Sequence, residues 1–306
     1  MYNFLLSRVA TGLLVTVVVS VLAFSLLRLS GDLALEFAGE NATFAEIEQI
    51  RDRLELNKPL PLQYLDWTQD LLAGDMGNSL FSQEPVSHLL LTHLAVTAKL
   101  AGLSLLFALS VSLPLGIASA YGTSLWVRWL ETILVTLAQA VPGFLLALIL
   151  ATFFGIYLGW LPVAGTESVQ HFVLPTITLG CAVIPALTRV TKTGVSEILT
   201  RQYVQVARAK GLGARQTLLT HVLPNAVIPI ISLASVQLGQ LFTGSVVIET
   251  VFALDGIGRL TLLSIERVDF PVVQAVVVCL AGIYVVLTIA ADILNALIDP
   301  RLRIKT

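Results

Sequence analysis

Long apolar segments separated by shorter polar ones dominate the pattern of this chain. Six of these segments could cross a bilayer: residues 9–29, 95–121, 130–156, 172–189, 225–250 and 272–296. A helix needs about 20 residues to cross a hydrocarbon core of ~30 Å. Because a backbone in lipid must satisfy its own hydrogen bonds, the pattern predicts an all-α membrane protein with six transmembrane helices.

Composition supports this class. Of the 306 residues, 56% are hydrophobic and 12% are charged, which is too apolar for an ordinary soluble domain. Basic residues gather in a few loops, so we expect no nucleic-acid partner. Arg8 precedes an apolar run from Val9 to Leu27. This run is too long for a signal peptide and lacks a small-x-small cleavage site, so we expect a retained first span.

Motifs for catalysis or metal binding are absent from the sequence. There is no P-loop, no Gly-x-Ser-x-Gly and no His-Glu-x-x-His. Histidines 88, 93, 171 and 221 lack the spacing of metal ligands. Cys181 and Cys279 lie in apolar segments and are interpreted as small buried hydrophobes. We therefore predict that this chain is not an enzyme and holds no metal or cofactor.

A polar segment separates the first two spans. Between Ser30 and His93 the chain carries eleven acidic residues and three basic ones, a bias that suits the outer side of the membrane. Thr43 followed by Glu46 predicts a capping box at the start of an amphipathic helix. A second helix follows, with Tyr64 and Trp67 placed for the headgroup region.

The other long polar segment runs from Arg189 to Pro224 and is basic. Its basic residues are Arg189, Lys192, Arg201, Arg208, Lys210 and Arg215, against the single acid Glu197. The positive-inside rule places such a loop in the cytoplasm. Arg8, Arg128 and the C-terminal Arg301, Arg303 and Lys305 agree. We therefore predict that both termini are cytoplasmic.

Within this loop the spacing predicts two helices separated by glycines. Thr200 is expected to cap the first, along which Tyr203, Val206 and Ala207 recur at helical spacing. Gly211 and Gly213 are expected to end it by adopting positive φ, and a second helix is expected from about Ala214 to Pro224. A helix, a break and a helix form a surface that another protein can grip.

These residues resemble a known loop. Gln205-Val206-Ala207, Gly211 and Leu223-Pro224 match the spacing of the EAA motif of ABC importer permeases, with Gln205 in place of the usual Glu and Val206 in place of the first Ala. His221 stands where an Ile is usual. The run Y-V-Q-V-A-R-A-K-G-L-G is similar to the subgroup of dipeptide, oligopeptide, glutathione and nickel importers.

The resemblance extends over most of the chain. Leu56 to Leu60 and Gly74 to Ser79 resemble the outer loop of the dipeptide and nickel permeases. F-A-L-D-G-I-G-R-L and the stretch from Arg267 to Pro271 resemble two further outer motifs, with Asp255 replacing a usual Pro and Val268 as an inserted residue. The closing Asp299-Pro300-Arg301 is similar as well.

The resemblance implies an ABC type I importer permease fold divided into a first span (1–29), an outer loop (30–94) and a core (95–306) with a coupling loop at about 190–224. It implies three kinds of partner: a homologous second permease, two ATPase subunits that bind ATP and Mg, and an extracytoplasmic solute-binding protein. The substrates implied are di- and oligopeptides or a nickel chelate. The implied ATPase-coupling residues are Tyr203, Gln205, Val206, Ala207, Arg208, Lys210, Gly211 and Pro224.

Charges within spans are functional candidates because burying them in lipid costs about 2.5 to 3.5 kcal/mol. Lys99 lies near an outer helix end and can snorkel, whereas Glu249 and Asp292 are predicted to pair helices or subunits. Pro142, like Pro114 and Pro185, is expected to kink a span. The alternative function is a stand-alone secondary transporter or a membrane enzyme, although a carrier would be expected to show paired carboxylates deep in its spans.

Overall fold

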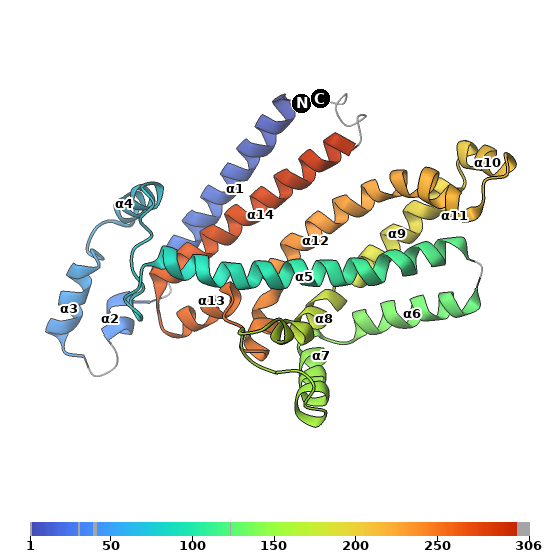
Figure 1. Ribbon diagram of the computed structural model, residues 1–306. Helices are drawn as coiled ribbons and strands as arrows, with labels where there is room; N and C mark the ends of the chain where they lie inside the picture. Colours follow the sequence, from blue (N-terminus) through green and yellow to red (C-terminus); the bar gives the residue numbers. More distant parts are fainter. Residues whose placement is uncertain (1, 30, 39–41, 123, 299–306) are drawn as a thin grey trace.

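The computed structural model describes residues 2–29, 31–38, 42–122 and 124–298, and every element named in these ranges is a helix (Figure 1). The α-helices are α1 (Tyr2–Leu29), α2 (Leu33–Ala38), α3 (Phe44–Arg53), α4 (Leu60–Leu72), α5 (Val86–Tyr121), α6 (Leu125–Ala140), α7 (Gly143–Leu150), α8 (Val173–Cys181), α9 (Ile184–Leu199), α10 (Gln202–Ala209), α11 (Ala214–Thr217), α12 (Leu223–Val251), α13 (Ile257–Glu266) and α14 (Phe270–Ile298). The π-helices are η1 (Ala151–Tyr157) and η3 (Leu218–Val222), and η2 (Val169–Phe172) is a 3₁₀-helix.

Four helical stretches are long and apolar enough to cross a membrane alone. They are Leu6–Leu29, Val86–Tyr121, Ala214–Val251 and Phe270–Leu294. Two bent pairs, Leu125–Ala140 with Gly143–Tyr157 and Val169–Cys181 with Ile184–Leu199, raise the number to six if each pair crosses once. The prediction of an all-α membrane fold is therefore confirmed. The C-terminal basic residues used for the orientation lie outside the described residues.

The third predicted span is broken, not kinked. The chain turns by 103° between α6 and α7, because Val141, as the residue before a proline, adopts an extended conformation that ends α6. Pro142 then stands at the start of α7. Pro114 behaves differently, since α5 continues through it. Pro185 lies in the first turn of α9, after a bend of 56°.

Two predicted boundaries also move. The second span begins at Val86, directly after Pro85, and not at residue 95. Helix α9 runs on to Leu199 and so takes up the first part of the predicted polar loop. In both cases helical hydrogen bonding continues through polar residues that hydropathy alone assigns to loops.

Helix α5 is the centre of the bundle. It packs against α8, α9 and α12, while α1 lies along α14 at one edge (Figure 1). The close packing depends on small residues: a Cβ added to Gly116 would lie 2.9 Å from the Thr188 carbonyl oxygen on α9, and one on Gly180 would lie 2.8 Å from the Ser104 carbonyl oxygen on α5. Such contacts let helix backbones approach in a medium that supplies no hydrophobic driving force.

The segment between α1 and α5 forms a separate group of short helices beside this edge (Figure 1). Its capping box is confirmed, because the Thr43 N–H donates to Glu46 Oε2 over 2.8 Å and the Glu46 N–H donates to Thr43 Oγ1 over 3.4 Å. Helix α4 lies against α1 through Tyr64 and Trp67, whose ring centroids are 5.3 and 5.8 Å from that of Phe24.

A buried carboxylate joins this segment to the core. Asp269, which is 3% exposed, accepts hydrogen bonds from the Ser79 hydroxyl and, over 3.0 Å, from the Leu80 N–H. Arg267 lies 4.0 Å above the Phe81 ring beside this contact. The residue between them, Val268, has a φ of +56°, a left-handed conformation that lets the turn accommodate it. Two motifs far apart in sequence thus form one contact.

We predict that Asp269→Ala lowers the free energy of unfolding by about 2 to 3 kcal/mol, because the Ser79 hydroxyl and the Leu80 N–H would remain buried without an acceptor. Unfolding in detergent micelles with a denaturing detergent measures this. Asp269→Asn keeps an acceptor and should cost less. Asp255→Ala, at an exposed ion pair with Arg259, is the control and should change stability by less than about 1 kcal/mol. An equal loss of unfolding free energy in D255A and D269A would contradict the stabilising role of the Asp269 contact.

Candidate coupling surface

The short helix α10 projects beyond the ends of α9 and α12 at one end of the molecule (Figure 1). It begins differently from the prediction. Thr200 does not cap α10; it ends α9, and its hydroxyl donates to the Glu197 carbonyl oxygen over 2.7 Å. Arg201 occupies the N-cap of α10, and its guanidinium pairs with the Glu197 side chain. The prediction is wrong because α9 extends far enough to use Thr200 itself.

One face of α10 anchors it to the bundle. Val204 is fully buried and Ala207 is 7% exposed. Val204 packs in a cluster with Val195, Val222 and Ala226. Val204 is not among the residues predicted for this surface, although its separation of three residues from Ala207 indicates a shared helix face. Ala207, predicted to be a coupling residue, is buried on this face, and its coupling role stays a prediction.

A neighbouring face of α10 is exposed and apolar. Tyr203 is 46% exposed and Val206 is 52% exposed, again three residues apart. Gln205, Arg208 and Lys210 are exposed around them. Large exposed apolar side chains with a polar rim are typical of a protein contact site.

Gly211 ends α10 as the prediction requires. Its φ is +88°, its N–H donates to the Arg208 carbonyl oxygen over 2.9 Å, and the Leu212 N–H donates to the Ala207 carbonyl oxygen over 3.3 Å. This pair of bonds is the Schellman motif, which favours glycine at the left-handed position. Gly213 has a φ of −63° and starts α11 in an extended conformation. The positive φ predicted for Gly213 is therefore wrong.

The second predicted helix does not end at Pro224. Helices α11, η3 and α12 run on without a break, so that Ala214–Val251 forms one span of 38 residues. Pro224 lies in the first turn of α12, directly after the π-helix η3. Proline has no N–H to donate into the preceding turn, and a wider π-turn is one way for a helix to pass such a position. The coupling loop is therefore joined rigidly to a long span.

The charges of this loop are partly neutralised. Lys192 pairs with Glu131 of α6 over 2.8 Å, and Arg201 pairs with Glu197. Within the described part of the chain, Arg208, Lys210 and Arg215 make no ion pair, and all three are exposed. The surface around α10 is therefore apolar at Tyr203 and Val206 and positive at its edge.

The predicted pore or subunit-contact residues lie apart from α10. Lys99 is exposed, with its Nζ 4.1 Å from the Phe172 ring centroid. Pro142 lies at the sharp turn between α6 and α7. Asp292 of α14 pairs with Arg8 of α1 over 3.0 Å, which is a contact between helices of one chain. The described contacts join none of these residues to one another or to Glu249.

Glu249 is fully buried and binds the start of α13. Its Oε1 accepts from the Thr97 hydroxyl over 2.7 Å, and its Oε2 accepts from the Arg259 N–H over 3.0 Å. The Thr97 hydroxyl in turn accepts from the Ile257 N–H over 2.8 Å. A Cβ on Gly256 would lie 2.3 Å from the Glu249 carboxyl carbon. A negative group at a helix N-terminus is favourable, so Glu249 joins α12, α5 and α13.

Comparisons with known proteins place the chain in a family. Residues 112–304 match the model of the "Binding-protein-dependent transport system inner membrane component", and residues 1–101 match the model of the N-terminal part of such membrane components. The chain is 35% identical over 309 residues to a "Probable peptide ABC transporter permease protein y4tP" of Sinorhizobium fredii, with 98% of this chain and 99% of the relative covered. It is 35% identical over 306 residues to the "Glutathione transport system permease protein GsiC" of Salmonella typhimurium, with both chains fully covered.

A solved structure confirms the fold. The methionine ABC transporter MetNI, in an inward-facing conformation, matches with a TM-score of 0.60 and 19% identity, over 70% of this chain and 97% of that chain. Membership of a permease family decides against a stand-alone secondary carrier and against a membrane enzyme. The chain therefore belongs to the inner membrane components of binding-protein-dependent transport systems, as a multi-pass permease subunit of an ABC importer.

Proposed function

We propose that the exposed face of α10 transmits the work of separate ATPase subunits to this permease. The observation that carries the proposal is the division of α10 into a buried anchor, Val204 and Ala207, and an exposed face with Tyr203 and Val206. A helix held on one side and bare on the other can receive a partner without losing its own packing. Gln205, Arg208 and Lys210 form the rim, and Gly211 and Pro224 shape the connections to the spans.

The proposed assembly contains this chain, a homologous second permease, two ATPase subunits that bind ATP and Mg, and an extracytoplasmic solute-binding protein. In this arrangement α10 and both termini face the cytoplasm, as the positive charge of the loop favours, and the segment 30–94 lies outside. We propose that the chain is divided into a first span (1–29), an outer segment (30–94) and a core (95–306).

We propose that the substrate is peptide-like, such as a di- or oligopeptide or glutathione. The support is the names of the relatives reported above, which refer to peptide and glutathione transport. A nickel chelate stays a prediction, since neither name refers to nickel. The proposed path of the force begins at α10, continues through α11, η3 and α12, and reaches α13 through Glu249. Movement of the coupling loop would then shift the far end of the bundle, as in rigid-body switching of packed helices.

We predict that Gly211→Val uncouples ATP hydrolysis from uptake. Forcing a β-branched residue into the left-handed conformation costs about 1 to 2 kcal/mol and favours another loop geometry. Gly213→Val is the matched control, because Gly213 is extended and no atom lies within 4 Å of an added Cβ. ATPase activity and peptide uptake in reconstituted vesicles measure the effect. Normal peptide uptake by G211V, or an equal loss of uptake in G213V, would count against the proposed transmission of force through α10.

Charge reversal at the rim tests partner binding. We predict that Arg208→Glu weakens association with the ATPase subunits by about tenfold and removes much of its salt dependence, because rim charges steer encounter. Arg53→Glu, on exposed α3, should leave association unchanged. Co-purification at increasing salt measures both variants. Unchanged binding of the ATPase subunits by R208E would show that Arg208 is not part of the proposed contact surface.

Sidedness has a direct test. After replacement of Cys181 and Cys279 by alanine, a cysteine placed at exposed Lys210 should react with a membrane-impermeant maleimide only in inside-out vesicles. A cysteine at exposed Asp52 of α3 should react in intact cells. Labelling of position 210 from outside would overturn the orientation and the coupling proposal together.

A further inference from the structure

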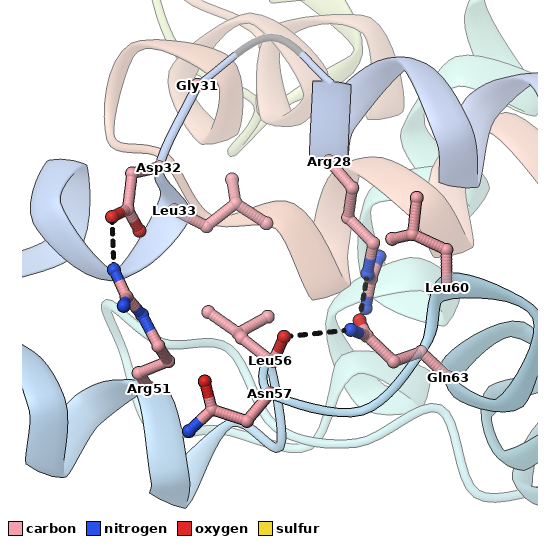
Figure 2. Close-up of a pocket in the computed structure, with 9 residues that line it drawn as sticks. All are labelled: Arg28, Gly31, Asp32, Leu33, Arg51, Leu56, Asn57, Leu60 and Gln63. Carbon is pink, nitrogen blue, oxygen red and sulfur yellow. Dashed lines mark hydrogen bonds and ion pairs between the residues drawn. The ribbon is translucent and has the colours of Figure 1, made fainter.

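A surface cavity of about 260 Å³ lies where α1 ends, between α2, α3 and α4 (Figure 2). It is lined by Arg28, Gly31, Asp32, Leu33, Arg51, Leu56, Asn57, Leu60 and Gln63. Figure 2 shows Arg28 and Arg51 entering it from opposite sides, one from α1 and the other from α3. Neither arginine belongs to the coupling surface.

The two arginines differ in their partners. Arg51 is neutralised by Asp32 and, over 3.5 Å, by Glu48. Arg28 makes no ion pair with any acidic side chain that the structure describes. Its guanidinium lies 3.7 Å from the Phe24 ring centroid, and its Nη1 is buried without a hydrogen-bond acceptor. Arg28 thus brings a positive charge to the cavity wall that none of the described carboxylates neutralises.

The side chain of Arg28 is held in place. Its Nε donates to Gln63 Oε1 over 2.7 Å, and the Gln63 amide group donates to the carbonyl oxygens of Leu56 over 3.1 Å and Lys58 over 2.8 Å. Gln63 is itself only 7% exposed. An ordered guanidinium without an acidic partner attracts the oxygens of a phosphate or carboxylate.

The position of the cavity indicates which anion reaches it. Arg28 lies in the last turn of a membrane-spanning helix, and α1 runs along the edge of the bundle rather than beside α5, α8 and α9 (Figure 1). Leu22, Leu26 and Leu29 of α1 are 53%, 65% and 71% exposed and fall on one helix face. They offer a surface for an acyl chain that runs along α1 toward the level of Arg28, which lies on another face of the helix. A lipid reaches this site more directly than a solute bound for the core.

We propose that this cavity binds the headgroup phosphate of an anionic phospholipid, with Arg28 as the principal ligand. Basic pockets at the membrane surface recognise anionic headgroups in this way. The site ties the outer segment and the first span to the surrounding bilayer. It is independent of the coupling role of α10.

The test compares the purified transporter complex in nanodiscs of phosphatidylcholine with and without phosphatidylglycerol. We expect phosphatidylglycerol to raise the thermal unfolding midpoint of the native complex, and native mass spectrometry to show the retained lipid. Arg28→Gln should reduce retention about fivefold, the effect of one cation at a membrane surface. Asn57→Asp, which adds a negative charge to the cavity without altering either arginine, should reduce it as well.

Arg53→Gln is the matched control, since Arg53 is an exposed arginine of α3 that does not line this cavity. The proposal is overturned if R28Q and N57D retain as much phosphatidylglycerol as R53Q. It is also overturned if inorganic phosphate or a peptide carboxylate, added to phosphatidylcholine nanodiscs, gives the same rise in the native complex, because the site would then bind a soluble anion. Loss of lipid with unchanged peptide uptake would still support it.

Discussion

The lack of water in the hydrocarbon core is the constraint on which this architecture depends. A peptide group there must find its partner within the protein, so the chain crosses as helices and interrupts them only where a substitute partner exists. At the end of α12, where helix gives way to a turn, buried Glu249 and Thr97 accept the first N–H groups of α13. Asp269 accepts a backbone N–H in a similar way, that of Leu80 in the segment before α5. Each of the two buried carboxylates accepts one backbone N–H and one hydroxyl, which offsets part of the cost of burying it.

In the proposed mechanism, the contacts that hold the helices together also transmit the force. The proposed coupling helix α10 is anchored by Val204, which packs with Val195 of α9 and Ala226 of α12, and Ala207 beside it is buried as well. From there a continuous helical path leads to Glu249, which connects α12 with α5 and α13. A displacement applied to α10 therefore acts on packed, close-fitting helices, which change between discrete arrangements more readily than they deform.

Some features of the fold and coupling surface could be predicted from sequence because local physics decides them. Hydropathy over about 20 residues marks membrane crossings, and Thr43 with Glu46 forms its capping box wherever the helix lies. Gly211 was recognisable because a Schellman motif favours glycine. The breaks were less predictable: proline at 142 ends a helix, whereas proline at 114 does not. Each of these prolines follows an apolar residue in an apolar stretch, so the local sequence does not separate the two cases.

The sequence by itself determined the class of protein, the apolar segments, and the polar loop with its apolar and basic residues, since each follows from local composition and spacing. Only the tertiary structure decided which face of α10 is buried, that Ala207 packs inward while Val206 is exposed, and that Ser79 meets Asp269. It also brought Arg28 and Arg51 to one cavity. These are contacts between residues distant in sequence, and their energies depend on how whole helices pack together, which no single stretch of chain specifies.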